Sequence, residues 1–203
     1  MSGRWIPLDV ADCHPSPFVQ FRRWFDEAIG EMHEREAIAL ISATSDGHPS
    51  ARMVLLRHVD EYSFGWYTNY QSRKGRELLA NPHAALLWYC EPLGRQIRIE
   101  GDAQMMSPAE SDAYFNARPR GHQLGAHASA QSQPIASREV LEDRVRELGE
   151  IYAGREVPRP EHWGGFRLIP SAFEFWQHRG DRLHDRVVYT PDATGWHRQR
   201  HSP

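Results

Sequence analysis

The sequence predicts a mostly antiparallel β-barrel with helices in the gaps between its strands. Many short segments are rich in β-branched and aromatic residues, and tight-turn signals such as Ser45-Asp46-Gly47 separate several of them. Helical periodicity is confined to a few stretches, so strands and helices do not alternate as in a parallel α/β sheet. The chain also lacks G-x-G-x-x-G, Walker and G-x-S-x-G motifs, which disfavours Rossmann, P-loop and α/β-hydrolase folds.

Length and composition indicate one folded domain. The 203 residues are 40% hydrophobic and 25% charged, with a formal net charge of −3, which is ordinary for a soluble protein. We expect residues 1–16, rich in Pro, Asp and His, to form a mobile leader before a single domain at 17–203. The sequence shows no bilayer-spanning apolar run, no signal-peptide pattern and no basic excess. We therefore expect a cytoplasmic protein without nucleic-acid or membrane partners.

The first half of the domain is predicted to be one helix followed by strands. Apolar residues recur at helical spacing before Gly30, at Phe18, Phe21, Phe25 and Ile29. Strands are expected next at residues 37–44, 51–59, 63–68, 84–90 and 96–100.

Three further helices are expected. Ser72 can cap residues 73–80, and Ser107-Pro108-Ala109-Glu110 forms a capping box that opens a helix through Phe115. Residues 137–154 are the clearest helix, with an apolar stripe made of Val140, Leu141, Val145, Leu148 and Ile151. After a Pro-broken link at 157–160, closing strands are expected at 165–168, 173–177, 186–189 and 196–200.

Neither disulfide nor metal chemistry is predicted. Cys13 lies in the leader and Cys90 ends an apolar run, so the two do not form a disulfide framework. The 12 histidines are scattered, without His-Glu-x-x-His or Cys-x-x-Cys spacing. Of the 24 basic residues only Lys74 is a lysine. A single lysine in so arginine-rich a chain is a weak hint of a specific role.

Polar side chains concentrate next to several of the predicted strands. The strand Arg52–Arg57 has an arginine at each end, and Tyr67-Thr68-Asn69 leads to Arg73-Lys74 in the first turn of a helix. Because a helix start presents free N–H groups and a positive dipole end, this segment suits a phosphate; a solvated helix start is the alternative.

Two more polar segments follow. Tyr114–Arg120, continued at Gln131-Ser132, can form a second anion site or only helix caps. Phe173–Gln177 and Arg182–Arg186 place charged groups beside an aromatic strand, which is hard to explain as core; a surface hairpin is the alternative.

These segments resemble, in the same order, those of the pyridoxine/pyridoxamine 5′-phosphate oxidase family. Its C-terminal signature is matched by Glu174-Phe175-Trp176-Gln177 and Arg182-Leu183-His184-Asp185-Arg186, and Arg95-Gln96 and Trp163-Gly164-Gly165 also fit. The resemblance extends from about residue 18 to the C-terminus. It implies an FMN-binding split β-barrel that forms a homodimer, with two FMN sites at the subunit interface.

The resemblance also implies roles for individual residues. FMN would be bound by Arg52, Met53, Val54, Leu55, Tyr67, Thr68, Arg73, Lys74, Gln96, Gln131, Ser132, Trp176 and Arg186, some of them from the second subunit. The substrate phosphate would be bound by Arg57, Tyr114, Arg118 and His122. Arg182 and His184 would lie against the pyridine ring opposite the flavin and act as the catalytic pair.

The implied reaction moves a hydride from the substrate's 4′ carbon to the flavin, which dioxygen reoxidises. Pyridoxal 5′-phosphate and hydrogen peroxide are the products, with ammonia when the amine is the substrate. Arg182 cannot act as a base, so its role is positioning and electrostatic. His184 can either move a proton or donate an orienting hydrogen bond.

Three departures from the family pattern bear on the substrate. Arg57 replaces a lysine, His122 replaces a small residue, and the leader lacks an Arg-Arg-x-Tyr stretch, for which Arg4 and Trp5 are the nearest candidates. Two other functions stay open: an FMN oxidase of the phenazine-pathway type with a different substrate, and a non-catalytic carrier of FMN or pyridoxal phosphate.

Overall fold

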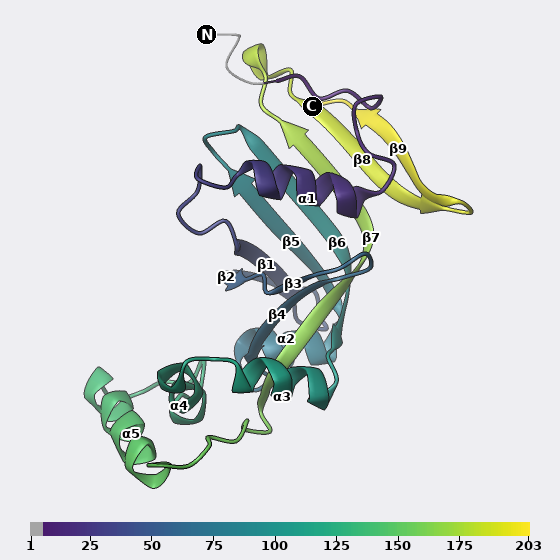
Figure 1. Cartoon of the computed structure of the whole chain (residues 1–203). Coiled ribbons are helices and arrows are strands. Elements are labelled where there is room, and N and C mark those ends of the chain that lie inside the picture. Colours follow the sequence, from purple (N-terminus) through teal and green to yellow (C-terminus); the bar gives the residue numbers. More distant parts are fainter. Residues whose placement is uncertain (1–5) are drawn as a thin grey trace.

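One antiparallel sheet organises the chain (Figure 1). The computed structural model describes residues 6–203. The strands are β1 (Ala37–Ala43), β2 (Pro49–Leu55), β3 (His58–Val59), β4 (Phe64–Asn69), β5 (His83–Cys90), β6 (Arg95–Met105), β7 (Trp163–Gln177), β8 (Asp185–Asp192) and β9 (Gly195–His201). They are paired in the order β2-β1-β5-β6-β7-β4-β3, and β8 and β9 extend the sheet from β7. This curled sheet confirms the predicted antiparallel, mostly β fold.

Helices occupy the gaps between strands, as expected. They are α1 (Pro17–Glu27), α2 (Arg73–Ala80), α3 (Pro108–Asn116), α4 (Arg120–Ala128) and α5 (Arg138–Ile151), with a 3-10 turn η1 (Gly180–Arg182) after β7. In Figure 1, α2 to α5 lie at one end of the molecule and η1 with the β8–β9 hairpin at the other. No helix among residues 6–203 is long and apolar enough to cross a membrane.

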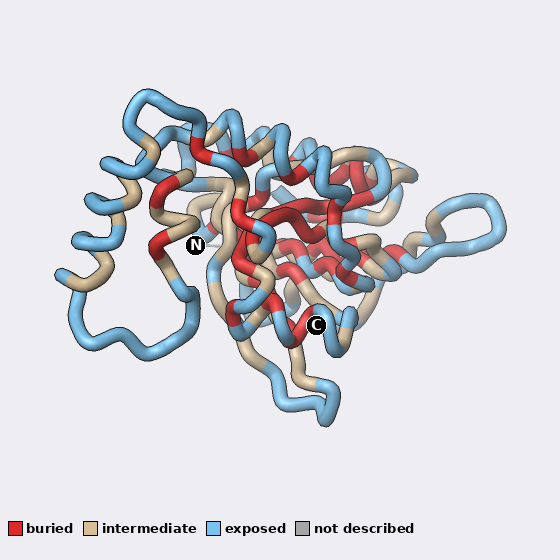
Figure 2. The backbone as a smooth tube through the Cα atoms, turned by 90° about the horizontal axis from the view of Figure 1, so that it is seen from below, coloured by how far each residue is buried: buried red, intermediate tan, exposed pale blue. Residues whose placement is uncertain are grey.

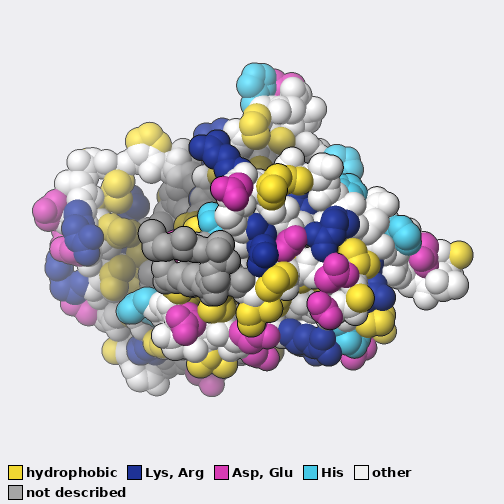
Figure 3. Space-filling model, turned by 90° about the horizontal axis from the view of Figure 1, so that it is seen from above, with side chains coloured by type: hydrophobic (Ala, Val, Ile, Leu, Met, Phe, Trp, Pro, Cys, Tyr) yellow, Lys and Arg dark blue, Asp and Glu magenta, His cyan; other side chains and the backbone are white. Residues whose placement is uncertain are grey.

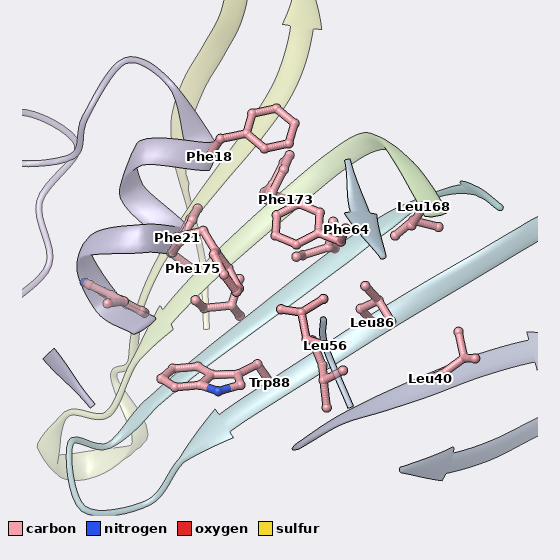
Figure 4. Close-up of a cluster of buried hydrophobic side chains, with 14 of the residues drawn as sticks. Phe18, Phe21, Leu40, Leu56, Phe64, Leu86, Trp88, Leu168, Phe173 and Phe175 are labelled. Carbon is pink, nitrogen blue, oxygen red and sulfur yellow. The ribbon is translucent and has the colours of Figure 1, made fainter. Parts of the chain in front are cut away.

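The core lies between α1 and the sheet. Phe21 of α1 is fully buried, and its ring lies 4.8 Å from that of Phe64 in an edge-on arrangement. The rings of Trp24 and Phe175 also pack edge-on, with centroids 5.3 Å apart. Figure 4 shows Phe18 and Phe21 of α1 facing Phe64 of β4 and Phe173 and Phe175 of β7. Figure 2 shows the buried segments at the centre of the molecule. The helical spacing of the phenylalanines therefore reflects burial against strands.

Several boundaries differ from the sequence-based expectation. The segment 51–59 divides into β2 and β3 because β2 pairs with β1 whereas β3 pairs with β4. The expected strands 165–168 and 173–177 join as the 15-residue β7, since β6 extends to Met105 and pairs along it with a register shift at Glu100/Gly101. Helix α4 was not predicted; its glycines, Gly121 and Gly125, weaken the helical signal.

The expected mobile leader is packed where the structure describes it. Leu8 and Cys13 are buried, the Leu8 amide donates to Asp185, and Tyr189 donates to the carbonyl of His14. Arg198 and Arg200 of β9 also donate to the carbonyls of Cys13 and Leu8. The segment from Leu8 to His14 therefore lies along β8 and β9, a partner that the sequence does not reveal. The candidates Arg4 and Trp5 lie outside the described residues.

Candidate functional site

A cavity of about 560 Å³ opens between β2, β4 and the start of α2 on one side and α3 and α4 on the other. Its lining includes eleven of the residues singled out from the sequence: Met53, Val54, Leu55, Arg57, Tyr67, Thr68, Lys74, Tyr114, Arg118, His122 and Gln131. It also includes Asn69, Ser129 and Trp163, to which the sequence analysis assigned no role. Segments far apart in the chain therefore meet at this cavity.

One wall of the cavity is a stack of aromatic rings. Tyr67 and Tyr114 are parallel with centroids 3.7 Å apart, and Trp163 continues the stack 5.6 Å from Tyr67. The guanidinium of Arg118 lies 4.5 Å over the Trp163 ring. Burial lowers the pKa of Arg118, and its Nη1 is buried without a hydrogen-bond partner. Because Arg118 lines the cavity, its positive charge can attract an anion there.

The opposite wall is the start of α2. Ser72 caps the helix, its Oγ accepting a hydrogen bond from the Gly75 amide. Lys74 Nζ donates to Thr68 Oγ1 at 3.0 Å and to Gln131 Oε1 at 3.2 Å, and no carboxylate pairs with it among residues 6–203. Burial, with the charge of Arg52, lowers the pKa of Lys74 to about 8. This desolvated cation at a helix N-terminus is suited to a phosphate.

The remaining predicted phosphate residues lie around Lys74, with a carboxylate that the sequence analysis missed. The Arg73 amide donates to Ser132 Oγ at 3.1 Å. The side chains of Arg52 and Arg73 both donate to Glu77, which is 5% exposed. The spacing of Arg73 and Glu77, four residues apart on a predicted helix, is the signal that could have identified the pair.

A second cluster surrounds the turn after β7. Trp176, His178, Arg182 and His184 line a cleft of about 450 Å³, and the rings of Trp176 and His184 lie 4.5 Å apart. Arg182 has a left-handed backbone with φ of 61°, which is uncommon for arginine and is found at functional sites.

The tautomer of His184 follows from its surroundings. Its Nδ1 accepts a hydrogen bond of 3.1 Å from the Arg179 amide. Burial lowers the pKa of His184, and the nearby His178 and Arg182 add to that effect. The neutral ring therefore carries its proton on Nε2, where it can act as a donor.

The last two predicted cofactor residues lie next to this second cluster. In the strand register, Trp176 pairs with Gln96 on β6 and with Arg186 on β8. The Arg186 guanidinium donates to Glu174 at 2.6 Å and to the carbonyl of Ser202 at 2.7 Å. Figure 3 shows basic and acidic side chains interspersed on the face of the molecule seen from above.

The single chain does not bring the two clusters together. Trp163 at the start of β7 lines the first cavity and Trp176 near its end lines the second cleft. Thirteen residues of extended strand span about 43 Å. A site that uses both clusters therefore requires two copies of the chain.

Comparison with known proteins identifies the family of the chain. Residues 25–152 match the family "Pyridoxamine 5′-phosphate oxidase", and residues 163–203 match "Pyridoxine 5′-phosphate oxidase C-terminal dimerisation region". A pyridoxine/pyridoxamine 5′-phosphate oxidase of Paraburkholderia phymatum is 54% identical over 97% of this chain and 93% of its own. The Rubrobacter xylanophilus protein of that name is 54% identical over 96% of this chain and 89% of its own length.

Two solved structures share the fold of this chain. PhzG from Burkholderia lata, determined with tetrahydrophenazine-1-carboxylic acid, superposes with a TM-score of 0.91 at 33% identity over 99% of this chain and 100% of its own. A pyridoxamine 5′-phosphate oxidase-related protein of Nostoc punctiforme shares the fold, with a TM-score of 0.70 at 17% identity. The match covers 90% of this chain and 97% of the other. On both the sequence and the structural evidence, the chain belongs to the pyridoxine/pyridoxamine 5′-phosphate oxidase family.

Proposed function

We propose that the protein is an FMN-dependent oxidase that converts pyridoxine 5′-phosphate or pyridoxamine 5′-phosphate to pyridoxal 5′-phosphate, with dioxygen as the acceptor. The observation that carries the proposal is the first cavity, where an aromatic wall lies between a cationic helix start and the unpaired guanidinium of Arg118. FMN with its phosphate at the helix start and a phosphorylated substrate at Arg118 would supply one anion to each end of the cavity. We place this activity in the cytoplasm, as a step of vitamin B6 synthesis.

The residues at the start of α2 fit the phosphate of FMN. Lys74 would provide the charge, and Thr68 and Ser132 would provide hydroxyls, at the positive end of the α2 dipole. The Lys74 ammonium is already held in place by neutral oxygens, so a phosphate gains a preorganised cation. When bound, FMN supplies the hydride acceptor and the reaction with dioxygen.

Arg118 fits the phosphate of the substrate. Its side chain is held over Trp163 with one donor unsatisfied, and Tyr114 in the adjoining stack contributes a hydroxyl. Arg57 and His122 line the same cavity and would complete the anion site. The aromatic wall excludes water and presents flat surfaces to a ring, which orients the substrate.

Arg182 and His184 would reach this cavity from the second subunit of a homodimer. In that arrangement the guanidinium provides positive charge at the ring. The Nε2–H of His184 donates a hydrogen bond, because Nδ1 is already occupied by the Arg179 amide. This geometry favours the orienting role of His184 over proton transfer.

A second candidate keeps the flavin and changes the substrate. The similarity to PhzG covers 99% of the chain, and His122 adds an imidazole to the anion site. An oxidase of a reduced phenazine carboxylate would use Arg118 for a carboxylate in place of a phosphate. A non-catalytic carrier of FMN or pyridoxal phosphate is the third possibility.

The deciding experiment measures turnover of the FMN-loaded protein in air with each phosphorylated vitamer, following aldehyde and peroxide together. Equal amounts of both products support the proposal. Turnover of tetrahydrophenazine-1-carboxylic acid alone supports the second candidate, and a yellow protein inactive on all three compounds is a carrier. Arg182→Ala should lower turnover and leave the flavin spectrum intact; full activity would remove Arg182 from the site.

A further inference from the structure

Glu77 is a buried carboxylate that connects three elements beside the first cavity. It lies on α2 with 5% exposure. Its Oε2 accepts hydrogen bonds from Ser42 on β1 at 2.6 Å and from Ser50 on β2 at 2.5 Å. Its Oε1 accepts from Arg73 Nε at 2.8 Å. Burial disfavours its ionisation, but these hydrogen bonds and the charge of Arg52 lower the pKa of Glu77 to about 2, so the group is an anion.

Glu77 determines which part of Arg73 is available to a ligand. The Arg73 side chain is 60% exposed and is held through Nε alone. Among residues 6–203 the carboxylate engages Nε and no hydrogen bond uses the two terminal nitrogens, so these remain available to a ligand. The backbone amide of the same residue contacts the Ser132 hydroxyl. A guanidinium whose two Nη groups are free can bind a phosphate in bidentate fashion, provided that the long side chain is already ordered.

Arg52 differs from Arg73, because its guanidinium is used within the protein. Its Nη1 donates to Ser42 and to the Leu40 carbonyl, and its Nη2 donates to Ser50 and Glu77. It acts on the cavity only through charge, which contributes to the lowered pKa of Lys74.

The charges of this group match those of a phosphate monoester. Arg52, Arg73 and Lys74 are three cations and Glu77 is one anion, which leaves a net charge of +2. A phosphate monoester carries about −1.5 to −2 at pH 7. Without Glu77 the three cations would repel one another, and the exposed Arg73 would be free to move into solvent.

We propose that Glu77 is a positioning residue for the cofactor phosphate: it holds the Arg73 guanidinium by Nε so that its terminal nitrogens, together with Lys74, bind the phosphate of FMN. The inference rests on the proposed function. Glu77 itself does not touch the ligand.

The test compares FMN with riboflavin, which has the same ring and ribityl chain but no phosphate. Dissociation constants of both are measured by flavin fluorescence for the apo forms of the wild type, Glu77→Gln and Glu142→Gln. Glu142 is the matched control, because it also pairs with an arginine one turn away on a helix but is exposed on α5. Glu77→Gln should weaken FMN binding about tenfold or more and leave riboflavin binding unchanged. Glu142→Gln should change neither.

A double-mutant cycle separates positioning from general disruption. If Glu77 acts through Arg73, then Glu77→Gln adds no further loss of FMN affinity to Arg73→Gln. Should Glu77→Gln not fold, Glu77→Asp keeps the charge and withdraws the carboxylate from Arg73, so the preference for FMN over riboflavin should still fall.

The outcomes are distinguishable. An unchanged or increased FMN preference in the Glu77 variants rejects the positioning role, and so does an equal loss for both flavins, which would indicate a structural defect. A wild type that binds neither flavin rejects the proposed function and this inference together.

Discussion

Lys74 is the residue whose protonation is most directly coupled to ligand binding. Because burial lowers the pKa of Lys74 to about 8 in the free protein, the ammonium is fully charged only below that pH. A bound phosphate would raise this pKa, so binding takes up a proton above pH 8. We expect the FMN dissociation constant to be constant from pH 7 to about 8 and to rise above it, by up to about tenfold per pH unit.

Fluorescence titrations of FMN between pH 7 and 9.5 check this expectation. Riboflavin provides the control, since its binding involves no phosphate and should not follow Lys74. Lys74→Met should bind FMN more weakly and lose the rise above pH 8. An unaltered pH profile in that variant would show that another group titrates.

His184 is expected to act as a hydrogen-bond donor. Its Nδ1 accepts from the Arg179 amide, and burial keeps its pKa below the ordinary value. The neutral form is therefore the main one at pH 7. His184→Gln places an amide N–H close to the position of Nε2, so kcat/KM should fall by no more than about tenfold. A loss of about 10²–10⁴ would instead indicate proton transfer by His184.

At the scale of elements, the start of α2 has to approach the end of β4 closely. A Cβ on Gly75 would collide with the carbonyl oxygen of Tyr70, a backbone atom that cannot yield without moving the helix. Gly75→Ala should therefore lower the free energy of unfolding by about 1–3 kcal/mol and weaken FMN binding, because it displaces Lys74. Urea denaturation and FMN titration measure the two effects.

Gly149 provides the matched substitution. It also lies within a helix, α5, but a Cβ there would meet only Leu124 Cδ1 at 3.9 Å. Gly149→Ala should stabilise the protein by about 0.5–1 kcal/mol through helix propensity. If both substitutions had the same effect, the close approach at Gly75 would not be what requires glycine.

At the scale of the whole molecule, the separation of the two clusters along β7 predicts complementation between subunits. Arg118→Ala damages the first cavity and Arg182→Ala damages the second cluster. When the two inactive variants are unfolded, mixed and refolded, half of the dimers are hybrids in which one of two sites has no substitution. Activity should recover to about a quarter of the wild-type value.

Refolding each variant alone is the control for this experiment, and it should give no recovery. A mixture that stays inactive would mean that Arg118 and Arg182 serve the same site from one chain. That result would reject the two-subunit arrangement.

Local patterns of the sequence predicted most of the elements. The capping box at Ser107 and the cap at Ser72 mark α3 and α2 because side-chain hydrogen bonds to the first turn are local. The length of β7 was not predictable, since it follows from pairing with β6, which is distant in the chain. The same is true of Leu8 and Cys13, which are buried in a segment that hydrogen bonds tie to β8.

By itself, the sequence determined the family, the antiparallel strand pattern and most of the residues of the first cavity, because these depend on residue type and spacing along the chain. The tertiary structure decided three further points: that Arg118 keeps an unpaired buried donor, that Arg52 and Arg73 share the carboxylate of Glu77, and that Arg182 and His184 lie far from the cavity in the same chain. Burial, hydrogen-bond partners and the distance along a strand arise only when segments remote in sequence are brought into contact, and no local pattern records them.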